Sequence, residues 1–398
     1  MPRPVRVLSL YEGFFAGGAR ILHTDVVQGL HARGDQRHSV LSVASHARRE
    51  STLQPIHRDP RFLRLASAGI DVVSLGRTAG SEPLQPASYT DRQLRLAAEA
   101  VRRADVVLSL KEQPLGLLLA LRRRGMMPDV PVAVALHRSD PLHSGPALEW
   151  LSNAAETGLL TASISCAEST SVAYAPYLGR GTLRFVVPNG IDTRLFRPGT
   201  EEERASTRAA LGIPAVAPVV VFAARFDAMK DPGLFLRAVA VHARLRPGTH
   251  YVLCGAGMTR DNPAFAALLD ECGVGAGLPV HALGIRADMP ALLQVADIVA
   301  LTSAFGEASP LCLIEGAACG ATPVTTDVGD SARAVQGIGV VTGREPTGIA
   351  VAWDDVLERR AALREAAIAE RPRLGRDRMI EEYRTAIDAL LEVREAAA

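Results

Sequence analysis

The sequence predicts an α/β protein made of two doubly wound domains, each a parallel sheet covered by helices on both faces. Short, apolar, β-branched runs alternate with helical patterns along the whole chain, which is typical of parallel strands that are buried on both faces. This rhythm breaks once, near 188–200, in a segment rich in turn-forming residues, and then restarts. A chain of 398 residues is long enough for two such cores.

The first domain is expected over residues 1–190. Its strands are predicted from the apolar runs 5–10, 38–45, 71–76, 105–110, 130–136 and 162–167, with helical patterns such as 18–33 and 91–103 between them. Gly17 and Gly18 stand at the first strand-to-helix turn, where a glycine pair lets backbone amides face a phosphate or simply makes a tight turn. His137 follows another strand, a position where a lone histidine is more often structural than catalytic.

The second domain is expected over residues 197–372. Its strands are predicted from the runs 218–225, 249–255, 278–284, 297–302, 322–327 and 338–342. A last helix, over about 375–396, carries an apolar stripe that needs a surface to cover: Met379, Ile380, Tyr383, Ala386, Ile387, Leu390 and Leu391.

Composition describes a folded, water-soluble protein, with 48% hydrophobic and 22% charged residues. No apolar run reaches the ~18–20 residues of a transmembrane helix, and the apolar N-terminal run is interpreted as a strand and not as a signal peptide. The five cysteines form no C-x-x-C pair, so we expect reduced thiols, no zinc site and a cytoplasmic protein.

Charge is distributed unevenly, with the positive excess in the first half of the chain. This excess is compatible with an anionic acceptor or a membrane surface, although a solvated face is the simpler interpretation, and we expect no nucleic-acid partner. Only two of the 44 basic residues are lysines, Lys111 and Lys230. A lysine in so arginine-rich a chain indicates either a place where a compact ammonium is needed or an accident of composition.

Ligands of doubly wound sheets bind at the carboxyl ends of the strands. Arg225 and Lys230 follow one strand of the second half, where two cations suit a diphosphate but would look the same as an exposed surface pair. Gly255 ends the next strand, and Gly284 and Ile285 the one after it, so backbone can approach a ligand at both turns.

The stretch AFGEASPLCLIEGAACG carries two glutamates eight positions apart, Glu307 and Glu315. Ser309 and Pro310 predict a helix start, with serine as a cap and proline in the first turn, and Gly320 predicts the end. Glu307 then lies on the loop before the helix and Glu315 more than one turn inside it. The free amides at the start of this helix, from Leu311 onward, would favour an anion.

Four ordered segments together resemble the retaining nucleotide-sugar glycosyltransferases of the GT-B fold, in the glycogen-synthase-like family four. They are GGARILHTDVVQGLHARG, VVPNGIDTRLFRPG, FAARFDAMKDPGLFLRAVA and VADIVALTSAFGEASPLCLIEGAACGATPVTTDVGD, and the last holds a Glu-x7-Glu pattern. The resemblance covers nearly the whole chain. It implies two Rossmann-like domains facing across a cleft, with the final helix (375–398) completing the first domain.

The resemblance also implies roles for these residues. Glu307 would contact the donor sugar, Glu315 would hold the ribose hydroxyls, and Arg225 and Lys230 would bind the diphosphate and stabilise the leaving group. His137 would lie near the reacting sugar. The remaining donor-binding positions would be Gly17, Gly18, Gly255, Gly284, Ile285, Ser309, Pro310 and Leu311.

The implied activity is transfer of a hexosyl-type sugar from an NDP-sugar, UDP- or GDP-linked, to a hydroxyl of a small molecule or an envelope precursor. No D-x-D motif stands at a strand end, so we expect no catalytic metal and no cofactor beyond the NDP-sugar co-substrate. Two alternatives share the donor site: a sugar-phosphate synthase or hydrolase that uses an NDP-sugar, and a non-catalytic sugar-binding protein.

A dinucleotide oxidoreductase is disfavoured, because G-x-G-x-x-G does not follow the first strand. Acceptor choice is expected from the loops 45–65, 77–90 and 137–146 of the first domain. The resemblance gives Lys111 no role, so its substitution is expected to change little.

Overall fold

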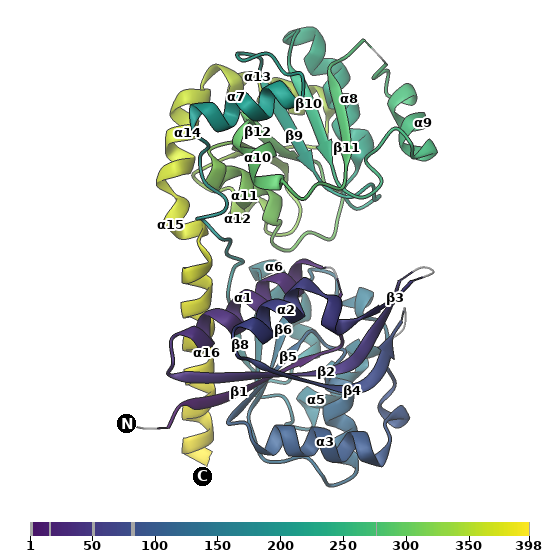
Figure 1. The fold of residues 1–398 in the computed structure, drawn as a ribbon, viewed down its shortest axis with the longest axis vertical. Coiled ribbons are helices and arrows are strands. Elements are labelled where there is room, and N and C mark those ends of the chain that lie inside the picture. The colour runs from purple at the N-terminus through teal and green to yellow at the C-terminus, as the bar shows by residue number, and fades with distance from the viewer. Residues whose placement is uncertain (1–2, 16, 50–51, 81–83, 276, 398) are drawn as a thin grey trace. The chain divides into compact units, whose positions relative to one another are not determined.

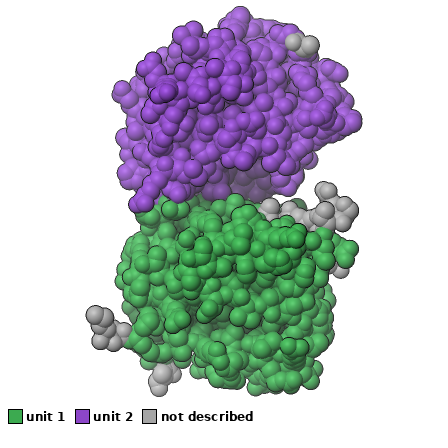
Figure 2. All heavy atoms as spheres, in the orientation of Figure 1, with its two compact units in different colours: residues 1–190, 376–398 green, residues 191–375 purple. Residues whose placement is uncertain are grey.

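Two separate sheets divide the chain into two units in this computed structural model (Figure 1). Unit 1 comprises residues 1–190 and 376–398, and unit 2 comprises residues 191–375 (Figure 2). The structure describes residues 3–15, 17–49, 52–80, 84–275 and 277–397, so parts of the expected acceptor loops, 50–51 and 81–83, lie outside the described residues. The prediction of two doubly wound α/β domains is confirmed.

Unit 1 is built on a sheet with the order β3-β2-β1-β5-β6-β7-β8, in which β4 also pairs with β2. Only the β2–β3 pairing is antiparallel among the described strands. The strands are β1 (Val5–Tyr11), β2 (Gln36–Arg49), β3 (Thr52–Pro55), β4 (Asp71–Ala79), β5 (Val106–Leu110), β6 (Val132–Leu136), β7 (Ala162–Ser165) and β8 (Leu183–Val186). Strand order reverses between β1 and β5, which makes this pair the switch point of the sheet.

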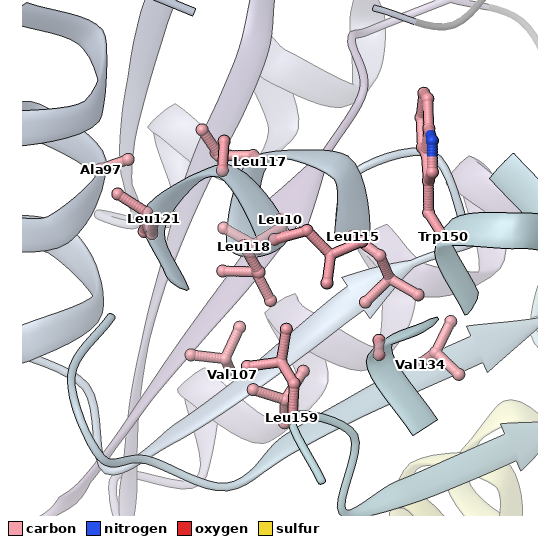
Figure 3. Close-up of a cluster of buried hydrophobic side chains, with 14 of the residues drawn as sticks. Leu10, Ala97, Val107, Leu115, Leu117, Leu118, Leu121, Val134, Trp150 and Leu159 are labelled. Carbon is pink, nitrogen blue, oxygen red and sulfur yellow. The ribbon is translucent and has the colours of Figure 1, made fainter. Parts of the chain in front are cut away.

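The helices of unit 1 cover this sheet and bury its apolar faces. They are α1 (Gly18–Ala32), α2 (Pro60–Ser67), α3 (Asp91–Arg102), α4 (Leu115–Arg123), α5 (Pro146–Glu156), α6 (Glu168–Tyr174) and α16 (Arg376–Ala397), with the 3₁₀ turns η1 (Ile56–Arg58), η2 (Pro86–Ser88), η3 (Pro141–Ser144) and η4 (Ala175–Tyr177). The leucines of α4 pack with Val107 of β5 and Val134 of β6 in one core cluster (Figure 3). Because α4 is apolar nearly all round, it lies inside the unit.

Unit 2 is built on a wholly parallel sheet with the order β11-β10-β9-β12-β13-β14. Its strands are β9 (Val219–Ala223), β10 (His250–Cys254), β11 (Val280–Gly284), β12 (Ile298–Leu301), β13 (Thr322–Thr326) and β14 (Val340–Thr342). Its helices are α7 (Glu201–Ala210), α8 (Pro232–Leu245), α9 (Pro263–Glu271), α10 (Met289–Gln294), α11 (Leu311–Cys319), α12 (Ser331–Ala334), α13 (Pro346–Glu358), α14 (Arg360–Ala369) and α15 (Arg371–Leu374). The switch point lies between β9 and β12.

Every strand expected from the sequence is present, and two were missed. Strand β3 is a short antiparallel addition to β2, and β8 lies just before the junction predicted near 188–200. Each has only four residues, and β8 begins with the exposed Leu183 and Arg184, so neither gives the signal of a long buried strand. Helix α11 begins at Leu311, with Pro310 as its N-cap residue and no side-chain cap hydrogen bond there, and it ends at Gly320 in the left-handed conformation (φ 92°).

Helix α16 packs onto α1 and β5 within unit 1. Its expected stripe is buried from Met379 to Leu390, and only Leu391 is half-exposed. At the junction, Ile191 forms an isolated parallel bridge with Gly375, so the two segments that leave unit 2 lie side by side. No helix in the described part of the chain is long and apolar enough to span a membrane.

The packing of α11 on β12 predicts a stability difference between two glycines of unit 2. A Cβ on Gly316 would lie 2.4 Å from Cγ1 and 2.8 Å from Cβ of Val299, whereas a Cβ on the exposed Gly348 would meet nothing closer than Glu345 Cβ at 4.0 Å. We expect Gly316→Ala to lower the free energy of unfolding by about 1–3 kcal/mol through overpacking. Gly348→Ala, in the first turn of α13, should be neutral or stabilising by up to about 1 kcal/mol.

Chemical denaturation of both variants beside the parent protein measures this difference. Equal effects of the two substitutions would contradict the close packing of α11 on β12.

Candidate functional site

The loops that follow β9 and β12 are tied together at the switch point of unit 2. The Ala304 amide donates to the Met229 carbonyl over 2.8 Å. The Thr302 hydroxyl lies 3.2 Å from the Lys230 carbonyl oxygen and 3.0 Å from that of Asp231, and donates to both. The backbone around Lys230 is therefore fixed by the neighbouring strand end.

An ion pair between Lys230 and Glu307 lies at this junction. Nζ of Lys230 contacts Oε1 of Glu307, and the Ser303 hydroxyl donates to the same oxygen. The Glu307 side chain is 5% exposed and the Lys230 side chain 16%, so the pair is largely withdrawn from water. Among the described residues, Oε2 of Glu307 has no hydrogen-bonding partner, which leaves one carboxylate oxygen available.

The loop after β13 closely approaches the backbone of Glu307. Gly329 has φ 58°, and a Cβ there would lie 1.8 Å from the Glu307 carbonyl oxygen, so no other residue fits without moving the loop. The Asp330 amide also donates to the Ala308 carbonyl over 3.3 Å. Sequence reasoning missed Gly329, and its only signal was a glycine in the turn after an apolar strand.

Glu315 lies on α11 with its carboxyl half-buried. It makes no hydrogen bond or ion pair with any residue that the structure describes, and burial raises its pKa to about 7. The Cys312 thiol, one turn earlier, is subject to the charges of Lys230, Glu307 and Glu315, and burial raises its pKa to about 12. The charges of the lysine and of both glutamates therefore act on the first turn of α11.

The residues at the start of α11 lie beside this group. Ser309 is half-buried, Pro310 is buried, and the helix proper starts at Leu311. The first amides of a helix have no intrahelical acceptor, and together with the helix dipole they favour a bound anion. This start therefore can contribute donors to a phosphate group.

The other predicted residues of unit 2 are two exposed residues, Arg225 and Ile285, and two glycines in turns, Gly255 and Gly284. The Arg225 side chain is 64% exposed and pairs with Asp227 at 3.3 Å, so the structure does not bring it onto the Lys230–Glu307 pair. A Cβ on Gly255 would lie 2.0 Å from the Ala224 carbonyl oxygen, which requires glycine. The Gly255 amide donates to the Gly284 carbonyl over 2.8 Å, and the Ile285 side chain beyond it is 80% exposed.

Three predicted residues belong to unit 1. Gly17 and Gly18 are exposed at the N-terminus of α1, where Gly17 is the N-cap residue. His137 follows β6 and is half-buried, and its Nε2 has no hydrogen-bond partner among the residues that the structure describes. Burial, and next the charge of Lys111, lower the pKa of His137 to about 3, so its imidazole is neutral. The described residues contain no group of three or more side chains suited to hold a metal ion.

Comparison with known proteins finds a family match within unit 2 and a set of curated relatives. Residues 217–362 match the family described as glycosyl transferases group 1, which confirms the resemblance for most of unit 2. A D-inositol 3-phosphate glycosyltransferase of Mycobacterium avium (strain 104) is 37% identical over 174 residues, which are 43% of this chain and 38% of that protein. The chain therefore aligns with under two fifths of the length of this curated relative.

Solved structures of the GT-B fold resemble the whole chain. Anabaena HepE, crystallised in complex with UDP, has a TM-score of 0.77 at 20% identity and covers 97% of this chain and 100% of its own. Sucrose-phosphate synthase from Thermosynechococcus elongatus has a TM-score of 0.72 at 16% identity and covers 98% of this chain and 100% of its own. At these identities the likeness establishes the fold, two Rossmann-like domains.

The raised pKa of Glu315 predicts how stability depends on pH. In the unfolded chain this carboxyl titrates near its ordinary value of 4.5, and in the folded protein near 7. Its proton binding therefore stabilises the fold fully below about pH 4.5, and this contribution is lost as the pH rises through about 7. Glu315→Gln, which is always neutral, should become more stable relative to the parent between pH 5 and 8.5, by at most about 3 kcal/mol.

Thermal unfolding at the two pH values measures the effect. Glu365→Gln, at an exposed position on α14, is the matched control and should show no such trend. A Glu315→Gln difference that is the same at both pH values would contradict the burial of this carboxyl.

Proposed function

We propose that this protein is a glycosyltransferase that moves a hexosyl-type sugar from a nucleoside diphosphate donor to an acceptor hydroxyl. The observation that carries the proposal is the buried Lys230–Glu307 pair at the β9/β12 switch point, inside the segment that matches glycosyl transferases group 1. Ligands of doubly wound sheets bind at this place, and an ammonium there suits a diphosphate.

The donor is held by unit 2 in this proposal. Lys230 and the first amides of α11 bind the diphosphate, and Arg225 swings from its exposed position to join them. Oε2 of Glu307, which has no partner among the described residues, accepts hydrogen bonds from sugar hydroxyls. Glu315, an unpaired half-buried carboxyl, accepts the ribose hydroxyls. Roles for Gly17, Gly18 and His137 toward the donor are part of the same proposal.

The names of similar proteins suggest which donors and acceptors to assay first. HepE was crystallised with UDP and with UDP-glucose, so UDP-glucose is the first donor to test and GDP-sugars the second. The curated relatives are named for D-inositol 3-phosphate, which makes small hydroxylated molecules the first acceptors to test.

The reaction proceeds with retention and without a metal ion in this proposal. The acceptor oxygen forms a bond to the anomeric carbon as the bond from that carbon to the diphosphate oxygen breaks. The acceptor proton passes to the departing phosphate oxygen, so the products are the glycoside and the nucleoside diphosphate. Lys230 stabilises the negative charge that grows on the leaving group, which is an electrostatic role.

Lys230→Ala should lower turnover by roughly 10²–10³-fold, the loss expected when one preorganised charge stabiliser is removed. Release of nucleoside diphosphate from UDP-glucose, with and without acceptors, measures turnover and identifies the product. Arg244→Ala removes an exposed cation at the end of α8 and should leave turnover unchanged. Equal losses in both variants would contradict the role of Lys230, and release that never depends on an acceptor would indicate a hydrolase instead.

Turnover should be unchanged in excess EDTA, because in this proposal Lys230 and Arg225 bind the diphosphate, which a divalent ion does in metal-dependent transferases. The assay compares initial rates before and after chelation. Loss of turnover that Mn²⁺ restores would overturn the metal-free part of the proposal.

A further inference from the structure

The second lysine of the chain lies at the other switch point. Lys111 directly follows β5, whose neighbour β1 marks the reversal of strand order in unit 1. The chain has only two lysines among 44 basic residues, and each lies at the carboxyl end of a switch-point strand or on the loop after it. This is where a doubly wound sheet binds its ligand.

The backbone of Lys111 is held in an unfavourable conformation. Its φ is 68°, and among the described residues only one other non-glycine, Asp231 beside Lys230, has a positive φ. The Lys111 amide donates to the Ala135 carbonyl over 3.0 Å, and the Ser109 hydroxyl donates to the Lys111 carbonyl over 2.8 Å. Such conformations persist where the surroundings impose them, and they gather at functional sites.

The Lys111 ammonium is half-buried and has no hydrogen bond or ion pair with any residue that the structure describes. Burial, and next the charges of Arg20 and Arg138, lower the pKa of Lys111 to about 8. Glu112 and Glu12 oppose this effect. Lys111 is therefore a partly desolvated cation near the charges of two arginines, and no acid among the described residues forms an ion pair with it.

The acids around Lys111 are engaged with other groups. Glu12 pairs with the Arg20 guanidinium at 3.2 Å. The buried Glu112 accepts hydrogen bonds from the Tyr174 hydroxyl and, over 3.0 Å, from the Ser144 hydroxyl. Arg138 donates only to the His143 carbonyl, over 3.1 Å, among the described residues, so most of its N–H groups remain available.

We propose that Lys111 and Arg138 bind an oxyanion, a phosphate monoester or a carboxylate, that the acceptor carries. The inference rests on the proposed transferase function, since it names the chemical class of that acceptor. It replaces the expectation from the sequence that Lys111 is dispensable. The sheet places both side chains at one edge, because β5 and β6 are paired, the Lys111 amide donates to the Ala135 carbonyl of β6, and Arg138 comes two residues after β6 ends. The charge of Lys111 also acts on His137, which precedes Arg138.

The two lysines allow one labelling experiment to test both proposals separately. The full-length protein is treated with acetic anhydride, and acetylation at Lys111 and Lys230 is measured by mass spectrometry. UDP is added alone in one sample. Inorganic phosphate or acetate is added together with UDP in two others, and a sample with UDP and sodium chloride at equal ionic strength is the control. An anion bound at Lys111 keeps the ammonium protonated and slows its acetylation.

We expect UDP to protect Lys230, and phosphate or acetate to protect Lys111 as well. Protection by phosphate alone identifies a phosphate monoester, and protection by acetate alone a carboxylate. Lys111 acetylation that neither anion slows more than sodium chloride does would overturn the inference, even where UDP protects Lys230. Failure of UDP to protect Lys230 would count against the proposed function and not against the oxyanion site.

Variants supply the second test. Asparagine tolerates a positive φ, so Lys111→Asn removes the ammonium without adding backbone strain. With a polyol monophosphate as acceptor, Lys111→Asn should raise KM by about 10–100-fold, the worth of one charge-assisted hydrogen bond, and change kcat much less. With the same polyol lacking its phosphate, Lys111→Asn should change neither KM nor kcat. Arg95→Gln, at an exposed position on α3, is the matched control, and equal effects on the charged and neutral acceptors would overturn the inference.

Discussion

The contact between Lys230 and Glu307 is the interaction on which the candidate site of unit 2 depends. A carboxylate that is 5% exposed costs free energy unless a charge or several hydrogen-bond donors pair with it. The loops after β9, β12 and β13 supply the partners: the lysine, the Ser303 hydroxyl and the close approach of Gly329. Because these loops come from adjacent strands at the switch point, the sheet topology itself assembles the pair.

Unit 1 repeats this arrangement with one difference. Its switch point also presents a lysine, but the acids near Lys111 are bound to Arg20, Tyr174 and Ser144, and its ammonium has no partner among the described residues. In the two proposals, Lys230 binds a phosphate of the donor and Lys111 binds an oxyanion of the acceptor. Under both proposals, lysine stands at these two places of an arginine-rich chain because a compact ammonium approaches an oxyanion as a point charge.

Most of the fold could be predicted from the sequence, because buried parallel strands are continuous apolar runs with a clear signal. Strands β3 and β8 could not, since each has only four residues and neither has a fully buried apolar run. Glu307 on a loop and Glu315 inside a helix followed from the caps near Pro310 and Gly320. The direct contact between Lys230 and Glu307, which are 77 positions apart, could not be predicted. It depends on which strands are adjacent in the sheet, and local sequence patterns do not determine strand order.

Other features were out of reach for similar reasons. The close approach of Gly329 to Glu307 and the positive φ of Lys111 arise only when separate strand ends meet. The exposure of Arg225 was also not foreseeable, because a cation on a loop has the same sequence signal whether it lies in a site or on the surface.

The most direct test of the proposed donor site measures how much Lys230 contributes to the affinity for a nucleoside diphosphate. Calorimetry first selects the best ligand among UDP, GDP and ADP, and then compares it with its own nucleoside in the parent protein and in Lys230→Met. We predict that the parent prefers the diphosphate, that Lys230→Met loses most of this preference, by about 10–100-fold, and that nucleoside affinity stays unchanged. A preference that is the same in both proteins would contradict the assignment of the β9/β12 switch point as the donor site.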